Sequence, residues 1–184
     1  MWAVMGVVTA DSDCRWTVVR VCVTVLHCTV AALFLTRQAV IREGRAADMA
    51  ACLPSLIVSG LAFRAAPSTN AWSSFSESVF IVGTTIAVVS LVALGRSFAV
   101  LPALRTIRTR GPYAVVRHPI YLGESLLVVA CAVAAVSMAS ASILPLHMAS
   151  IAWRVHKEEQ VLSRCSNFAG YCHQVKWRLV PGIW

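Results

Sequence analysis

Two clusters of polar residues interrupt an otherwise apolar chain, and their residue types suit the binding of a charged ligand. The first lies in residues 110–124 (RGPYAVVRHPIYLGE) and the second in residues 153–162 (WRVHKEEQVL). Pro119 fits the first turn of a helix, where its missing N–H costs nothing. Arg117 and His118 are therefore expected at a helix N-terminus, where backbone N–H groups and the helix dipole favour an anionic group.

The second cluster places cationic and anionic groups on one helix face. Arg154 and Glu158 are four residues apart, so their side chains share a face. Taken alone, this pattern also fits the charged end of a membrane helix with a surface ion pair worth about 0.2–1 kcal/mol. Glu124 lies within the apolar part of the first cluster, where a carboxylate is costly unless it is paired. Two interpretations of Glu124 stay open: it forms a polar wall of a site, or it belongs to a buried structural ion pair. His27 and His147 fit hydrogen bonds inside a helix bundle.

The composition is that of a membrane protein. The 184 residues are 58% hydrophobic and 13% charged, with a mean hydropathy of +0.73, whereas soluble domains carry about 25% charged residues. We therefore expect one integral-membrane domain over residues 1–184, with an all-α, polytopic helix-bundle fold. The net charge of +8 is spread among apolar segments, which favours a role in topology over nucleic-acid binding. The seven cysteines show no metal-ligand spacing, so no metal is expected.

Five apolar segments predict about five transmembrane helices, followed by a C-terminal interfacial helix. A span needs about 20 residues. Three spans fall in residues 1–95, and residues 96–184 hold the loop with the first cluster, a helical hairpin and a cytoplasmic tail. The predicted spans are residues 16–35, 46–63, 78–94, 119–138 and 142–155.

Basic residues lie on alternate loops of this five-span arrangement. Thirteen of the 16 Lys and Arg residues fall in the first loop, the third loop and the tail. Cytoplasmic loops carry an excess of these residues, which predicts an outside N-terminus, a cytoplasmic C-terminus and a multi-pass protein of the cell membrane. The thirteen are Arg37, Arg42, Arg45, Arg96, Arg105, Arg108, Arg110, Arg117, Arg154, Lys157, Arg164, Lys176 and Arg178.

The fourth and fifth spans are joined by only a few residues, around residues 139–141, so they form an antiparallel hairpin. The start of the fourth span and the charged end of the fifth are then neighbours at one membrane face. Ionisable groups that converge at membrane depth usually serve a site or a pathway. The hairpin therefore predicts that His118 lies beside Glu158 and Glu159.

These motifs resemble the isoprenylcysteine carboxyl methyltransferase family and its bacterial relatives, within a superfamily that includes phospholipid methyltransferases. The resemblance covers about residues 94–184, which is half of the chain. It rests on LGRSF at residues 94–98, GPY at 111–113, RHPIYLG at 117–123, Arg154, Glu158, Glu159, Leu162 and RLVP at 178–181.

The resemblance implies methyl transfer from S-adenosyl-L-methionine, bound in a pocket that faces the cytoplasm. It implies catalytic roles for Arg154 and Glu158. A carboxylate of the second cluster suits the cofactor's ammonium, and a tyrosine suits its adenine or its sulfonium. The residues implied in cofactor binding are Tyr113, Arg117, His118, Pro119, Tyr121, Gly123, Glu158 and Glu159.

The favoured reaction is carboxyl O-methylation of a lipophilic or prenylated substrate reached from the membrane lipid. Arg154 suits the orientation of such a carboxylate, which is already ionised at pH 7. An amine acceptor would instead need a base such as Glu124 or His156. The alternatives are N- or S-methylation of a phospholipid or small metabolite, an NADPH-dependent sterol-type reductase, and a membrane protein without catalytic activity. Relatives often carry two tail tyrosines three residues apart, but here Tyr171 is followed by Gln174, so a role for Tyr171 stays open.

Overall fold

The computed structural model describes residues 17–36, 42–43, 50, 53–68, 71–95, 103–104, 107–135 and 137–184. Within these ranges the chain forms α-helices, one 3₁₀ helix and a pair of two-residue strands. The elements are α2 (Val18–Thr36), β1 (Arg42–Glu43), α4 (Leu53–Ala65), α5 (Ser74–Leu94), β2 (Ala103–Leu104), η3 (Gly111–Ala114), α6 (Pro119–Ala135), α7 (Met138–Leu162) and α8 (Phe168–Gln174).

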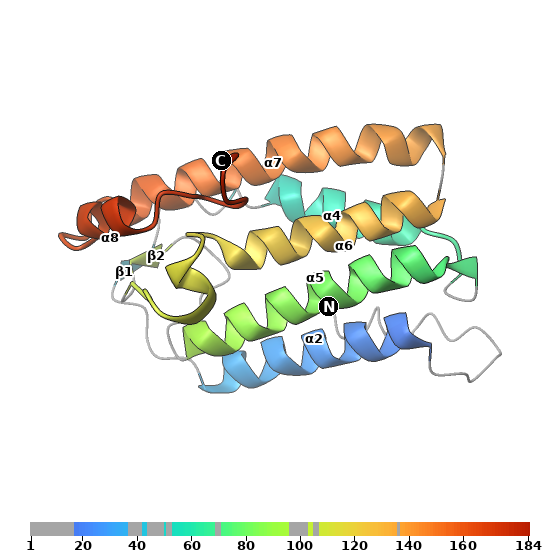
Figure 1. Ribbon diagram of the computed structural model, residues 1–184, viewed down its shortest axis with the longest axis horizontal. Helices are drawn as coiled ribbons and strands as arrows, with labels where there is room; N and C mark the ends of the chain where they lie inside the picture. Colours follow the sequence, from blue (N-terminus) through green and yellow to red (C-terminus); the bar gives the residue numbers. More distant parts are fainter. Residues whose placement is uncertain are drawn as a thin grey trace.

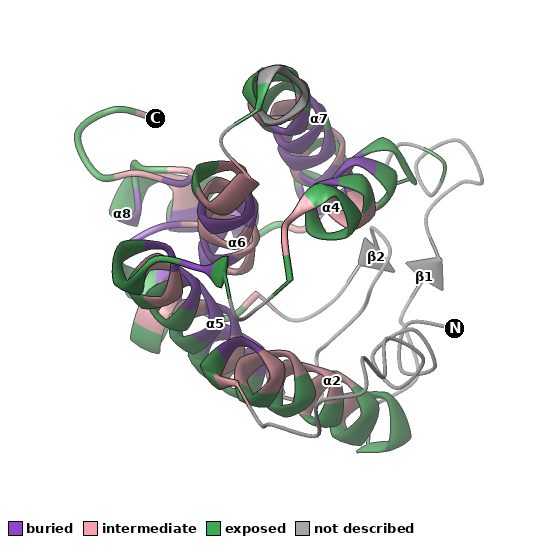
Figure 2. Cartoon of the chain, turned by 90° about the vertical axis from the view of Figure 1, so that its right-hand side faces the viewer, coloured by how far each residue is buried: buried purple, intermediate pink, exposed green. Residues whose placement is uncertain are grey.

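The long helices lie side by side in a bundle (Figure 1). α5 packs between α2 and α6, while α4 contacts both α6 and α7. Figure 2 shows buried residues on the sides of α5, α6 and α7 that face one another, whereas α2 is exposed along most of its length. The fold is therefore helical, as the sequence predicts, and the antiparallel pair of β1 and β2 is a minor addition to it.

The contact between α5 and α6 is unusually close. A Cβ atom added to Gly123 of α6 would lie 2.8 Å from the backbone N of Ala87 and 2.8 Å from the carbonyl oxygen of Gly83, both in α5. Small residues allow helix backbones to approach in this way. Gly123 thus fixes the position of α6 against α5, just beyond the start of α6.

Among the described residues, two helices are long and apolar enough to span a membrane. They are α2, with a mean hydropathy of 2.2, and α5, with a mean hydropathy of 2.1. α4 and α6 are apolar but have only 13 and 17 residues. α5 begins at Ser74, earlier than predicted, because the Ser73 hydroxyl accepts a hydrogen bond from the Ser76 N–H and caps the helix.

The hairpin turn lies earlier than the sequence suggests. α7 begins at Met138, so residues 139–141 are helical and do not form the turn. The Ala141 N–H donates to the Ser137 carbonyl at 3.0 Å, and alanine and serine are compatible with a first helical turn. α7 also continues to Leu162 and thereby carries the whole second polar cluster on one helix.

Several predictions concern positions whose structure is not described. The first part of the second predicted span, residues 46–52, lies outside the described residues except for residue 50. Five arginines of the predicted loops, two cysteines and part of the LGRSF motif also lie outside the described residues, either entirely or in their side chains. They are Arg37, Arg42, Arg45, Arg96, Arg105, Cys14, Cys52 and residues 96–98.

Candidate active site

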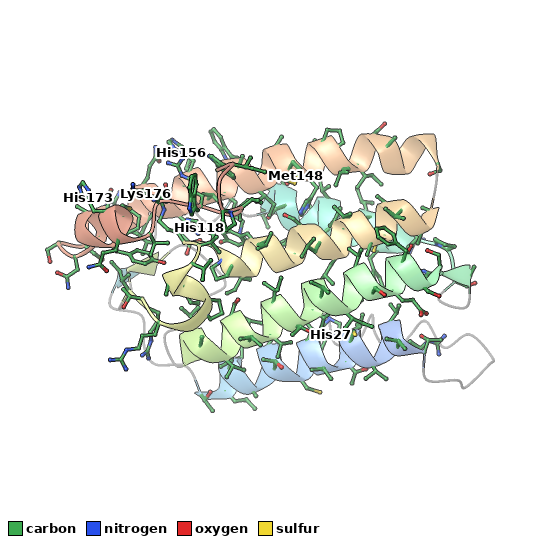
Figure 3. All side chains as sticks on the ribbon, viewed as in Figure 1. His27, His118, Met148, His156, His173 and Lys176 are labelled. Atoms are coloured by element: carbon green, nitrogen blue, oxygen red, sulfur yellow. The ribbon has the colours of Figure 1, made fainter. Side chains whose placement is uncertain are left out.

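The start of α6, the end of α7 and the C-terminal tail meet at one end of the bundle. Figure 3 shows His118 at this end, with Lys176 of the tail nearby and His27 well apart on α2. His118 Nε2 lies 3.2 Å from Glu159 Oε1, and its Nδ1 lies 3.7 Å from Glu158 Oε2. The predicted convergence of the two polar clusters is therefore present in the structure.

Glu159 binds three cationic or titratable side chains. Its Oε1 accepts from Arg117 Nε at 2.9 Å and contacts His118 Nε2, while its Oε2 accepts from Arg178 Nε at 2.9 Å. Burial raises the pKa of Glu159, but hydrogen bonds from His118 and Arg178 and the charges of His118 and Arg117 outweigh it and lower the pKa to about 2. Glu159 therefore ties α7 to the start of α6 and to the tail.

Glu158 lies beside two stacked rings. Tyr121 OH donates to Glu158 Oε2 at 2.6 Å, and the rings of His118 and Tyr121 are stacked at 5.6 Å with an interplanar angle of 12°. The Glu158 side chain is buried, with 8% of its surface accessible. One carboxylate and two aromatic faces are thus gathered within one turn of α6 and the last turns of α7.

The sequence suggests that the N–H groups just before α6 face a ligand. In the structure they donate to the C-terminal tail instead. The Arg117 and His118 N–H groups donate to the carbonyls of Trp177 and Arg178, both at 2.9 Å. Arg117 Nη1 also donates to the carbonyls of Val175 and Lys176, at 3.1 and 3.3 Å. The tail satisfies these donors because it folds back across the start of α6, so the N–H groups of Arg117 and His118 are used within the chain.

Three of the residues implied in cofactor binding make packing contacts in the structure, namely Tyr113, Pro119 and Gly123. Tyr113 is buried against α5, and its carbonyl accepts a hydrogen bond from Tyr171 OH at 2.8 Å. Burial raises the pKa of Tyr171, which keeps this hydroxyl protonated as the donor. Pro119 is fully buried at the first position of α6, as expected, and Gly123 faces α5. These positions brace the site, and Tyr171 ties the tail helix α8 to η3.

A second group of polar residues lies deeper in the bundle, between α4, α6 and α7. We call it the buried polar cluster, and it comprises Ser55, Ser59, Glu124, His147 and Arg154. Its contacts join Arg154 Nη1 to Ser55 Oγ at 3.0 Å and to Glu124 Oε2 at 3.6 Å, and Ser59 Oγ to Glu124 Oε1 at 2.8 Å and to His147 Nδ1 at 3.4 Å.

The sequence indicated only part of this cluster. Ser55 and Ser59 stand four residues apart in an apolar helix, and this spacing was the available signal for them. Arg154 also places its guanidinium 4.7 Å from the centre of the Tyr121 ring, which connects the buried polar cluster to Glu158. His156, the other base that the sequence offered, is exposed and contacts Gln160 instead (Figure 3).

The comparison with known families decides the class of this site. Residues 73–165 match the family described as phospholipid methyltransferase. The chain belongs to the phospholipid methyltransferase family. This confirms the wider superfamily that the motifs predicted, whereas the narrower resemblance to isoprenylcysteine carboxyl methyltransferases stays a prediction. No curated protein matches the chain.

The region shared with the phospholipid methyltransferase family runs from just before α5 to just after α7. It therefore includes His118, Tyr121, Arg154, Glu158 and Glu159, while the tail that covers them lies beyond it. The family is one of membrane-bound methyltransferases, and the apolar helices α2 and α5 agree with that setting. Within the described part of the chain, no group of three His, Cys, Asp or Glu side chains is placed to hold a metal ion.

Proposed function

We propose that the protein transfers a methyl group from S-adenosyl-L-methionine to a lipophilic acceptor at the membrane. The observation that carries this proposal is the group formed by Glu158, Tyr121 and His118, which sits within the methyltransferase family region. Its chemistry fits the methyl donor, whose ammonium suits a carboxylate and whose adenine and sulfonium suit aromatic faces. When bound, this donor supplies a methyl group on a positively charged sulfur.

Glu158 and Glu159 have different parts in this proposal. Glu159 already engages three side chains, so we assign it the positioning of His118 and the tail. Glu158 is the carboxylate for the donor's ammonium, and the stacked pair of His118 and Tyr121 forms the aromatic wall. Methyl transfer is a displacement in line with the breaking bond, so a rigid wall contributes by orientation.

The acceptor is better matched by an amine than by a carboxylate. Carboxyl O-methylation, the reaction favoured from the motifs, assigns Arg154 to the acceptor carboxylate. Arg154 is 3.6 Å from Glu124 and is buried, with 7% of its side chain accessible, so an anionic acceptor would have to displace Glu124. An amine head group, as in a phospholipid, can contact the accessible side of Glu124 while Arg154 stays in place. We therefore propose N-methylation, with carboxyl O-methylation of a prenylated or small lipophilic substrate as the alternative.

The membrane arrangement is part of the proposal. We assign α2, α4, α5, α6 and residues 142–155 of α7 to the membrane, with the N-terminus outside and the site on the cytoplasmic side. Large apolar side chains are exposed on the outer faces of these helices, which suits contact with lipid tails. A site between α4, α6 and α7 is then reached laterally by a lipid. The exposed apolar residues include Val21, Val25, Ile57, Leu61, Val82, Val89, Val92 and Leu146.

Ligand binding tests this function. Purified protein in detergent is titrated by calorimetry with S-adenosyl-L-methionine, S-adenosylhomocysteine and NADPH. We expect both S-adenosyl compounds to bind with sub-millimolar affinity, which corresponds to more than about 4 kcal/mol, and NADPH not to bind. Binding of NADPH alone would support the reductase alternative, and binding of none of the three would refute the methyltransferase proposal.

A further inference from the structure

The buried polar cluster contains more ionisable groups than the packing of three helices requires. His147 and Ser55 have no accessible surface, and Arg154 is 6% exposed. Glu124 and His147 come from apolar stretches of α6 and α7, Ser59 from the apolar helix α4, and Arg154 from the start of the second polar cluster. Such groups are costly inside a membrane protein and commonly form sites or proton relays. Ser59 and His147 belong to neither of the motifs that define the methyl-donor region.

Glu124 is the carboxylate of this cluster, and it is half-buried, as Ser59 is, whereas the other three members are buried. Its side chain retains 20% of its surface, compared with 7% for Arg154. Two groups hold the carboxylate in place, because Ser59 Oγ donates to Oε1 at 2.8 Å and Arg154 lies 3.6 Å from Oε2. Both interactions fix the orientation of the carboxylate. Glu124 therefore combines a partly accessible surface with a carboxylate held in a defined position.

The cluster is directly connected to the proposed methyl-donor site. Glu124 follows Tyr121 by three residues on α6, so the two side chains share a face. Arg154 bridges them, since its guanidinium lies 4.7 Å from the centre of the Tyr121 ring and near Glu124. Tyr121 in turn donates to Glu158 at 2.6 Å. An acceptor head group at the accessible side of Glu124 would lie on the same face of α6 as Tyr121 and the proposed methyl-donor site.

We propose that Glu124 accepts the proton of the methyl acceptor, and that Ser59 positions its carboxylate for this step. The inference rests on the proposed function and names the residue that makes the acceptor nucleophilic. A lipid ammonium group has no lone pair, so it must lose a proton first. The proton passes from nitrogen to a Glu124 oxygen, and the freed lone pair forms the new carbon–nitrogen bond. The carbon–sulfur bond of the donor breaks, and sulfur keeps its electron pair.

The positioning role follows from the contacts of the Ser59 hydroxyl. It lies 2.8 Å from Glu124 Oε1, 2.8 Å from the Ser55 carbonyl oxygen and 3.4 Å from His147 Nδ1. His147 has no accessible surface, and its Nε2 has no hydrogen-bond partner among the described residues, so a proton on this ring would have no onward acceptor. The proton is therefore assigned to Glu124 alone. Among the described residues, the charged or titratable groups that face Glu124 are Arg154 and, through Ser59, His147, both on α7.

The decisive variant is Glu124→Gln, which keeps the shape of the side chain and an oxygen for Ser59. Transfer of radiolabelled methyl is measured as a function of pH with two probes. The amine probe is a vesicle of phosphatidylethanolamine and phosphatidylglycerol, and the carboxylate probe is a phosphatidylglycerol vesicle that contains N-acetyl-S-farnesylcysteine. Affinity for S-adenosylhomocysteine is measured by calorimetry, and Glu77→Gln in the first turn of α5 is the matched control.

We expect Glu124→Gln to lower methylation of phosphatidylethanolamine about 100-fold, the usual range for a general base. The acidic limb of its pH profile should disappear, whereas affinity for S-adenosylhomocysteine stays within about twofold. Glu77→Gln should match the wild type. If Glu124→Gln retains the rate and the pH profile of the wild type, the inference is overturned. It is also overturned if the wild type methylates only the farnesylcysteine probe, although the proposed function then stands.

Failure of the proposed function gives a different result, because a wild type that neither binds S-adenosylhomocysteine nor labels either probe defeats both proposals. If Glu124→Gln does not fold, Ser59→Ala decides instead. It removes one hydrogen bond from the ionised carboxylate, so the acidic limb should move to higher pH by about one unit. An unmoved profile in folded Ser59→Ala protein would contradict the inference.

Discussion

Replacing Glu159 by Gln should destabilise the protein because one carboxylate neutralises three partners. The pKa of Glu159 lies at about 2, compared with an ordinary value of 4.5. A tenfold change in proton affinity is worth about 1.4 kcal/mol, so the ionised form stabilises the fold by about 3 kcal/mol. The side chain is only 12% exposed, so solvent screens this contribution little. The largest favourable contribution comes from His118, through its hydrogen bond and its charge, followed by Arg178 and Arg117. Arg178 is 38% exposed, so solvent reduces the value of its pair.

The sign of the pH dependence follows from the direction of the pKa shift. Because the folded-state pKa is lower than the ordinary value, the stabilisation is complete above about pH 5 and is lost as the pH falls toward 2. The thermal midpoint of the wild type in detergent, followed by tryptophan fluorescence, should therefore fall over this range. In Glu159→Gln the midpoint at pH 7 should be lower by about 6–12 °C, at about 2–4 °C per kcal/mol for a protein of this size.

Two comparisons make this test specific. Glu77→Gln removes a carboxylate from the other end of the bundle, and its effect should not exceed about 1 kcal/mol, the value of a helix N-terminal charge. The reasoning would be wrong if Glu159→Gln had the midpoint and the pH dependence of the wild type. It would also be wrong if the variant lost affinity for S-adenosylhomocysteine without any loss of stability, because Glu159 would then be a ligand of the methyl donor.

Four further substitutions test individual contacts. Glu158→Gln should weaken binding of S-adenosylhomocysteine at least tenfold in calorimetry, or about 1.4 kcal/mol, because it removes the charge for the ammonium. His118→Ala should have a similar effect on affinity, since it removes one face of the stacked pair; unchanged affinity in both folded variants would contradict the placement of the site. Gly123→Ala should lower the thermal midpoint, because its Cβ would lie 2.8 Å from the backbone of α5 and overpacking costs about 1–3 kcal/mol, while Gly170→Ala, with nothing within 4 Å, serves as the control. Tyr171→Phe should cost about 1–3 kcal/mol in thermal denaturation by leaving the Tyr113 carbonyl without this donor, and an unchanged midpoint would exclude the proposed tie between α8 and η3.

The pairing of the two motifs was predictable from the sequence because it follows from chain connectivity. A short link between two apolar helices forces them to be antiparallel, which brings the residues after Gly111 next to those after Trp153. Pro119 marked the start of α6 correctly for a local reason, since proline is favoured at the first helical position. Predictions that depend on local backbone chemistry and on connectivity are therefore the ones that agree with the structure.

Predictions that depended on distant partners were less complete. The N–H groups of Arg117 and His118 bond to tail carbonyls about sixty residues away in the chain, and no local pattern indicates this. Gly123 was assigned to the cofactor through its motif, but its missing side chain serves the contact with α5. Residues 139–141 gave no boundary because alanine and serine fit both a turn and a first helical turn.

Arg154 and Glu124 form one ion pair, yet they do not report equally on function. Arg154 contacts Ser55 of α4 and both Glu124 and Tyr121 of α6, so its loss would disturb three helices and the wall of the donor site together. It would also leave Glu124 inside the bundle without its cation, and breaking a buried pair in this way costs about 3–5 kcal/mol. Glu124→Gln also leaves a buried cation without its anion, but Arg154 then keeps the Ser55 hydroxyl and the Tyr121 ring. An inactive Arg154 variant is therefore compatible with a purely structural role, whereas an inactive Glu124→Gln variant that keeps the thermal midpoint of the wild type and still binds S-adenosylhomocysteine is not.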